Sequence, residues 1–233
     1  METMQMALQQ RAMTNVSEAV FTAKYFDPRD PVIPDLIIAA GEQDIGSDDI
    51  MACDNEQPVH KVTLPEYLFA SKMVSNAEYL GFMQADGYLR QEFWSDEGWQ
   101  WNRNCQHEAP EIWQQDVQGN WYSLSAQGQS DIDANAAVSG LSWYEADAFA
   151  RYAGCRLPHE FEWEAAMNSD SALMLSTGQA WVWCANTFFP YKGFQAFPYE
   201  RYSTPWFDSQ HYVMKGSSLY SGESVRQPSF RNF

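Results

Sequence analysis

Hydrophobic positions along the chain predict short helices separated by long stretches without a regular period. Residues 1–24 carry Met, Ala, Leu and Val at helical spacing, which predicts an N-terminal helix. Prolines 28, 31 and 34 then exclude regular helix and mark a linker that ends near residue 35. Because no second helix lies nearby in the sequence, we expect the first to pack on the remaining domain or on another chain.

Ser-x-x-Glu sequences mark the starts of two further helices. Ser75–Glu78 and Ser142–Glu145 each match a capping box and precede apolar residues at helical spacing. The first of these helices is predicted to stop near Gly87, and the second to end at Gly154. A third helix is predicted over residues 159–167, directly after an Arg-Leu-Pro sequence.

Short runs of β-prone residues predict strands, with no sign of a βαβ alternation or of an internal repeat. Residues 88–140 show no clear period and are predicted to be an irregular segment that is either functional or packed on the core. We therefore expect an α+β fold, rich in loops, with few short helices and short antiparallel strands. The predicted strands cover residues 36–40, 61–68, 180–184, 211–215 and 217–220.

Composition indicates one large domain, residues 36–233, preceded by the arm 1–35. The 233 residues are 45% hydrophobic and 15% aromatic, which suits a core filled by large rings in a loop-rich fold. An aromatic surface for a ligand is the alternative explanation of the ten tryptophans. The four cysteines, Cys53, Cys105, Cys155 and Cys184, form no CxxC pair, so free buried thiols are expected.

The charge balance excludes several classes of partner. A net charge of −17 without any basic cluster disfavours nucleic acid and anionic lipid. No run of about 18 apolar residues predicts a membrane span, and the first twenty residues lack the pattern of a secretory signal. We therefore expect a cytoplasmic protein. Sequence motifs of hydrolases, kinases and dehydrogenases are absent.

Four segments in a fixed order are similar to the superfamily of formylglycine-generating enzymes and sulfoxide synthases. They are residues 58–62 (PVHKV), 74–83 (VSNAEYLGFM), 142–166 (SWYEADAFARYAGCRLPHEFEWEAA) and 181–186 (WVWCAN). The resemblance covers roughly residues 41–233 and implies the C-type-lectin-like fold of sulfatase-modifying factors. It also implies one further C-terminal strand that this chain lacks.

Three other segments resemble the ergothioneine-type sulfoxide synthases: residues 86–101, 188–218 and 226–233. That resemblance implies an enzyme with mononuclear nonheme iron, which uses O₂ to join a thiol to the imidazole of a histidine derivative as a sulfoxide. The formylglycine-generating branch needs a cysteine pair near its C-terminal strands. Residues 216–233 contain no cysteine, so formylglycine generation is not expected.

The resemblance places the iron ligands in a helical domain with an HxxxHxE motif, which this chain lacks. Its histidines, His60, His107, His159 and His211, are about fifty residues apart, whereas a facial iron site needs converging ligands. We therefore expect no Fe(II) on this chain alone, and a separate helical partner that supplies it. His159 replaces a Thr or Ser of the family and is interpreted as a helix cap.

By resemblance, the C-terminal segment faces the substrate pocket. Asn232 can offer a donor and an acceptor to a carboxylate and an amine, and Phe233 adjoins it. Arg231 either pairs with a substrate carboxylate or pairs internally with an acidic residue such as Glu164. Tyr191 lies where the synthases present a tyrosine as proton donor, and a packed loop aromatic is the alternative interpretation.

Two tryptophans flank a pair of acids and are candidate substrate-binding residues. Trp94 and Trp99 enclose Asp96 and Glu97, a pair suited to acid–base work or Ca²⁺ binding. The alternative is a solvated hairpin that the two tryptophans hold to the core. Trp181 and Trp183 are predicted to share one face of a strand.

The predicted function is the substrate-facing wall of an ergothioneine-type sulfoxide synthase, completed by the helical partner. The alternative is a non-catalytic, lectin-like domain that binds a ligand or a protein, or a truncated remnant, because fold does not fix function.

Overall fold

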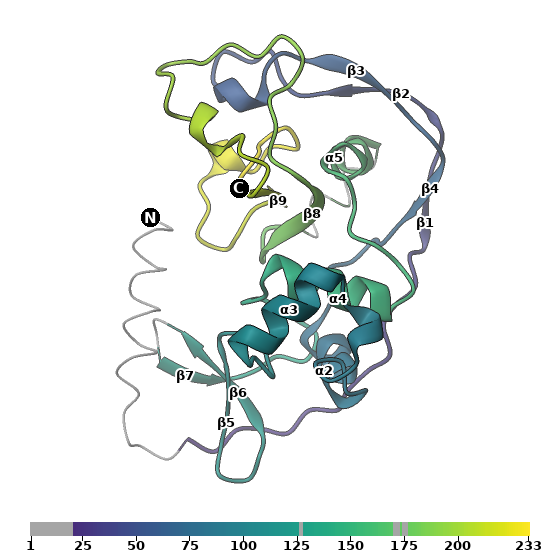
Figure 1. Ribbon diagram of the computed structural model, residues 1–233, viewed down its shortest axis with the longest axis vertical. Coiled ribbons are helices and arrows are strands. Elements are labelled where there is room, and N and C mark those ends of the chain that lie inside the picture. Colours follow the sequence, from purple (N-terminus) through teal and green to yellow (C-terminus); the bar gives the residue numbers. More distant parts are fainter. Residues whose placement is uncertain (1–20, 126–127, 170–172, 174–176) are drawn as a thin grey trace. The chain divides into compact units, whose positions relative to one another are not determined.

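The computed structural model describes residues 21–125, 128–169, 173 and 177–233, which fall into two compact units (Figure 1). Unit 1 contains residues 73–155 and the described residues up to Val32. Unit 2 contains residues 33–72 and the described residues from Arg156 to Phe233. The predicted N-terminal helix falls mostly on residues outside the described part. Residues 21–35 form neither helix nor strand, as the prolines predict.

In its described residues, unit 1 packs helices α2, α3 and α4 around an aromatic core and carries a small sheet. The core contains Tyr79, Phe82, Trp94 and Phe149, all buried. The elements are α2 (Asn76–Gln84), α3 (Asp96–Cys105), α4 (Trp143–Tyr152) and the antiparallel strands β5 (Trp113–Gln115), β6 (Trp121–Ser125) and β7 (Gly128–Asp131). The prediction that residues 88–140 are irregular was therefore wrong. These strands are three to five residues long and largely polar, too short to show a period of two.

Both predicted capping boxes are confirmed. Ser142 Oγ accepts a hydrogen bond from the backbone N–H of Glu145, whose carboxylate accepts bonds from the Ser142 N–H and hydroxyl at 2.8 Å each. Ser75 and Glu78 repeat this arrangement at the start of α2. Glu145 is buried and also accepts a bond from the Tyr88 hydroxyl at 2.6 Å. The cap therefore fixes α4 and satisfies a buried carboxylate.

Replacing Ser142 by Ala is expected to lower the free energy of unfolding by about 1 kcal/mol, because the cap loses its side-chain acceptor. Ser130→Ala is the matched control: Ser130 is exposed on β7 of the same unit, so its effect should stay within about 0.5 kcal/mol. Urea unfolding of the two variants compares them. Equal effects would contradict a stabilising role for this cap.

The elements assigned among the described residues of unit 2 include three antiparallel strand pairs and helix α5. In Figure 1, β1 leads into β2 and β3 into β4, so the first two pairs form one long two-stranded ribbon. Helix α5 contacts β2, β8 and β9. The elements are β1 (Leu36–Ile38), β2 (Gly41–Ile45), β3 (His60–Leu64), β4 (Tyr67–Phe69), α5 (Glu160–Ser169), β8 (Trp181–Thr187) and β9 (Tyr212–Gly216). The α+β, loop-rich C-type-lectin-like fold predicted for this sequence is confirmed.

The strand predicted over residues 217–220 was wrong, because local side-chain bonds favour a turn there. Ser218 Oγ accepts from the Tyr220 N–H at 3.1 Å, and Ser221 Oγ accepts from the Ser218 N–H at 2.9 Å. Serine hydroxyls that bind nearby backbone in this way compete with strand pairing. The strand containing Trp181 and Trp183 is confirmed, as is the third helix.

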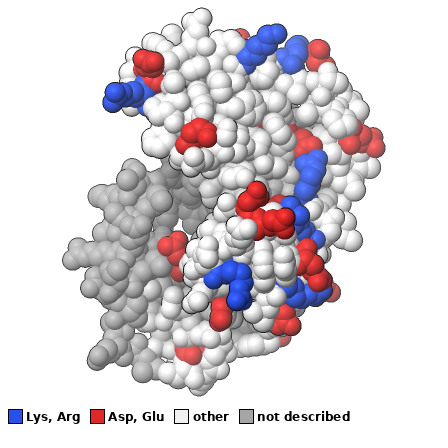
Figure 2. All heavy atoms as spheres, viewed as in Figure 1, with Lys and Arg blue, Asp and Glu red and all other residues white. Residues whose placement is uncertain are grey.

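Charged side chains are spread over both units. On the face shown in Figure 2, Lys and Arg lie among Asp and Glu and form no continuous basic surface. No helix within the described residues is long and apolar enough to cross a membrane. None of the four cysteines forms a disulfide with a described residue. Cys184 is buried, and this burial raises the pKa of its thiol, whereas Cys105 is exposed, contrary to the prediction of buried thiols.

Candidate functional site

Helix α5 places two carboxylates in the interior of unit 2. Glu160 and Glu164 are one turn apart, so their side chains lie on the same face of the helix. Both are at most 1% exposed. His159 precedes the helix, and its Nδ1 accepts a bond from the Phe161 N–H at 3.2 Å. Burial lowers the pKa of His159, which keeps the ring neutral and able to accept. The interpretation of His159 as a helix cap is confirmed.

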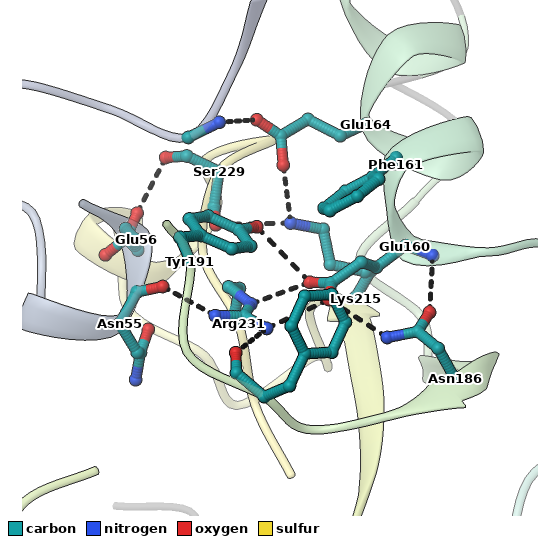
Figure 3. A network of polar contacts seen from close by, with 12 residues as sticks. Asn55, Glu56, Glu160, Phe161, Glu164, Asn186, Tyr191, Lys215, Ser229 and Arg231 are labelled. Atoms are coloured by element: carbon teal, nitrogen blue, oxygen red, sulfur yellow. Dashed lines mark hydrogen bonds and ion pairs between the residues drawn. The ribbon is translucent and has the colours of Figure 1, made fainter. Parts of the chain in front are cut away.

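Arg231 forms a buried, two-pronged ion pair with Glu160 (Figure 3). Its Nε and Nη2 donate to the two carboxylate oxygens at 2.6 and 2.9 Å. The guanidinium also donates to the backbone oxygens of Asn55, at 2.7 Å, and Phe189, at 2.9 Å. Four hydrogen bonds within the chain therefore hold this side chain. Internal pairing with an acid is confirmed, but the partner is Glu160 and not Glu164.

Tyr191 lies beneath Arg231 and shares its partner. The guanidinium carbon is 4.0 Å from the centre of the Tyr191 ring, and the phenol donates to Glu160 Oε2 at 3.3 Å. Burial, followed by the charge of Glu160, raises the pKa of Tyr191 well above its usual value. The phenol is therefore protonated at neutral pH, and it is packed in the core as the alternative interpretation held.

A second buried ion pair lies beside the first. Lys215, on β9, donates from Nζ to Glu164 Oε2 at 2.9 Å and to the Ser229 backbone oxygen at 3.1 Å. The other oxygen of Glu164 accepts from the Gly46 N–H at 2.7 Å. Figure 3 shows both pairs converging on the C-terminal segment from α5. Together they fix residues 229–231 against the helix.

The last two residues follow the part of the chain that the two ion pairs hold, and both are half-buried. The backbone of Asn232 pairs with Met214 at the edge of β9, through bonds of 2.8 and 3.0 Å. Its side-chain amide makes no hydrogen bond with any described residue. Phe233 stacks on Phe188, with ring centres 4.2 Å apart, and contacts Trp206. The C-terminal segment therefore presents an amide and an aromatic ring on a rigid support.

His211 borders the same aromatic cluster. Its ring meets those of Trp206 and Phe233 edge to face, and its Nδ1 lies 2.9–3.0 Å from both carboxylate oxygens of Asp208. That bond lowers the pKa of Asp208 to about 2. A carboxylate bound to Nδ1 orients the histidine ring, and the structure gives the other ring nitrogen no hydrogen bond with a described residue. This dyad was not predicted, although the spacing of three residues between Asp208 and His211 is visible in the sequence.

Tyr191, Arg231, Asn232 and Phe233 all belong to unit 2, whereas Trp94 and Trp99 belong to unit 1. Trp94 lies in the core of unit 1 and donates from its indole nitrogen to the Gly87 backbone oxygen at 2.9 Å. The predicted hairpin at residues 94–99 was wrong. Ser95 Oγ accepts from the Gly98 N–H and starts α3, so the two acids lie in the first turn of a helix.

A family model for the sulfatase-modifying factor enzyme 1-like domain matches residues 26–173. The chain belongs to this family. Sequence comparison finds hercynine oxygenase of Mycobacterium tuberculosis, 29% identical over 80% of this chain and 53% of that protein. Formylglycine-generating enzyme of Streptomyces coelicolor is 31% identical over 56% of the chain and 43% of that protein. Ergothioneine biosynthesis protein 1 of Schizosaccharomyces pombe is 23% identical over 78% of the chain and 25% of that protein.

The family resemblance implies nonheme iron. Each of the four histidines, however, contacts a residue near it in the sequence. His60 Nδ1 lies 3.1 Å from the Pro58 backbone oxygen, His159 caps α5 and His211 is held by Asp208. His107 stacks on Trp101 in unit 1. Among the described residues, no three His, Cys, Asp or Glu side chains gather as metal ligands. These residues do not fit a nonheme iron site by themselves.

Proposed function

We propose that this sulfatase-modifying-factor domain forms the substrate-facing wall of an ergothioneine-type sulfoxide synthase. The reaction would form a C–S bond between a thiol and a histidine derivative at the expense of O₂. The similarity to hercynine oxygenase over 80% of the chain carries the proposal. The geometry of the C-terminal segment supports it, since Asn232 and Phe233 stand half-buried on a support of two buried ion pairs.

Each residue of the segment has a role in this proposal. The Asn232 amide donates to the carboxylate of the histidine derivative and accepts from an N–H group. Phe233 and Trp206 provide aromatic surface for the imidazole or for an ammonium group. Arg231 holds the segment in place through Glu160. Tyr191 belongs to the same buried support, because its phenol donates to Glu160 and its ring lies against the Arg231 guanidinium.

The iron would come from a separate helical partner that carries an HxxxHxE motif. The chain spans about half the length of the curated relatives it matches, 53% in the case of the M. tuberculosis protein. The described residues gather no iron ligand set, so a partner would complete the site. The proposed localisation of this assembly is the cytoplasm.

Replacing Asn232 by Ala is expected to weaken binding of hercynine by about 10–100-fold. The variant loses the hydrogen bond to the substrate carboxylate, and one hydrogen bond to a charged group contributes about 1.5–3 kcal/mol. Isothermal titration under anaerobic conditions measures the affinity, first for hercynine and then for γ-glutamylcysteine. The backbone pairing of Asn232 with Met214 does not depend on the side chain, so the fold is preserved.

Asn104→Ala is the matched control, because Asn104 is exposed on α3 in the other unit. It should bind hercynine as the unchanged chain does. Equal affinities of the Asn232 and Asn104 variants would contradict the proposed role of Asn232. No binding of hercynine or thiol by the unchanged chain would favour the alternative, a non-catalytic lectin-like domain.

A further inference from the structure

Unit 1 contains a pocket at the C-terminal end of helix α3, and this pocket shares no residue with the proposed substrate wall. Its volume is about 320 Å³, which lies in the range of small-molecule sites. The lining comes from the segment after α2 and from the last turn of α3 with the residues that follow it. It includes Tyr88, Leu89, Asn102, Arg103, His107 and Glu108, all of unit 1.

Asn102 offers this pocket a hydrogen-bond acceptor. The residue is 5% exposed, and its Nδ2 donates to the Tyr88 backbone oxygen at 2.8 Å. Its Oδ1 makes no hydrogen bond with any described residue. Unlike the Oδ1 of Asn55, it is not sealed from solvent either. Because Asn102 lines the pocket, this oxygen is an acceptor that a bound molecule can reach.

Two opposite charges line the same pocket without pairing. Within the described residues, Arg103 forms no ion pair and no hydrogen bond, and its guanidinium carbon lies 6.0 Å from the centre of the Trp99 ring. Glu108 also has no ion-pair or hydrogen-bond partner in the described part of the chain. Both residues are exposed, so both charges are open to a ligand. A guanidinium binds a carboxylate in two-pronged fashion, and a carboxylate binds an ammonium group.

A flat ring and an apolar side chain complete the lining. The His107 ring stacks on Trp101, with ring centres 5.5 Å apart and an angle of 5° between the planes, so its orientation is fixed. Leu89 is 70% exposed. Covering such an apolar side chain with an apolar group of a ligand removes surface from water and is favourable.

We infer that this pocket binds a free α-amino acid with an apolar side chain. Arg103 takes the carboxylate, and Asn102 Oδ1 and Glu108 take the ammonium group. The partial negative charge at the C-terminal end of α3 also favours the ammonium group. The amino acid side chain lies against Leu89 and His107. A zwitterion has no net charge, so the net charge of −17 does not repel it as it would repel an anion. The inference does not rest on the proposed sulfoxide synthase function.

Titration of the chain with L-phenylalanine and with L-leucine, followed by NMR of the backbone N–H groups, tests the site. We expect saturable shifts centred on residues 102–108. Arg103→Gln and Glu108→Gln should each weaken binding by about 10-fold, through loss of one charge-assisted hydrogen bond. Both side chains are exposed and unpaired among the described residues, so the variants should fold. Arg226→Gln and Glu111→Gln, which remove exposed charges elsewhere, should leave the affinity unchanged.

Two analogues separate the charges of the ligand. L-phenylalaninamide lacks the carboxylate, so it should bind about 10-fold more weakly and lose nothing further in Arg103→Gln. N-acetyl-L-phenylalanine lacks the ammonium group and should be insensitive to Glu108→Gln in the same way. No saturable binding of either amino acid would overturn the inference. Shifts centred on Asn232, or an affinity that both pocket variants leave unchanged, would also overturn it by placing the amino acid elsewhere.

Discussion

Replacing Arg231 by Met is expected to lower the free energy of unfolding by about 3–5 kcal/mol. The change leaves Glu160, whose side chain is 0% exposed, as a buried carboxylate without its cation. Within the described part of the chain, only the amide of Asn186 and the phenol of Tyr191 remain as side-chain donors to it. Urea unfolding, read as a shift of the midpoint at constant slope, measures the loss.

Arg156→Met is the matched control for this variant. Arg156 makes a two-pronged pair with Glu162, which lies on α5 as Glu160 does. The side chain of Arg156 is 63% exposed. The Glu162 side chain is 8% exposed, but the guanidinium of Arg156 is largely solvated, so the loss of stability should be smaller than at Arg231. The double variant Glu160→Met, Arg231→Met should recover much of the stability, because it removes both buried charges together. A loss at Arg231 no larger than at Arg156 would show that the buried pair does not hold the C-terminal segment.

Replacing Lys215 by Met is expected to cost a similar amount, about 3–5 kcal/mol, for the same physical reason. Glu164 would keep the Gly46 N–H as a donor but lose its only cation among the described residues. The Ser229 backbone oxygen would lose its donor from β9, so residues 229–231 would also be held less firmly. The backbone N–H of Asn232 pairs with Met214. Its hydrogen exchange reports that loosening separately from global unfolding.

Lys61→Met is the control for the lysine variant. Lys61 lies on β3 of the same unit, and it and its partners Glu42 and Asp44 are 59–64% exposed. Its replacement should change stability by no more than about 1 kcal/mol. If the Lys215 variant were as stable as the Lys61 variant, the second buried pair would not contribute to the support of the site.

The helices were predictable because their signals are local. A Ser-x-x-Glu box satisfies backbone donors within four residues, so Ser75 and Ser142 mark helix starts without any knowledge of the fold. The cap at His159 was predicted from the family resemblance, because the family has Thr or Ser at that position. By contrast, α3 begins at Ser95 with no Glu three residues later, and its flanking tryptophans suggested a hairpin.

The site was predictable only in part, because its partners are far apart in the sequence. The family resemblance predicted that the C-terminal segment faces the substrate. The positive charge of Arg231 indicated that it could pair internally with an acid. The choice of Glu160 over Glu164 depends on which turn of α5 faces the segment, and the second pair depends on Lys215, 51 residues away. Asp54 and Asn55 lie in an acidic segment for which the sequence predicts only a loop. Their burial depends on Ser203 and Phe197, well over a hundred residues later.

In the proposed function, this chain supplies the substrate wall of a sulfoxide synthase, and a helical partner supplies the iron ligands. Metal analysis of the purified chain after anaerobic equilibration with Fe(II) and desalting tests it most directly. We predict no stoichiometric iron, with binding of hercynine retained and weakened by Asn232→Ala. One iron per chain would contradict this account and would make the chain a self-sufficient iron-binding domain.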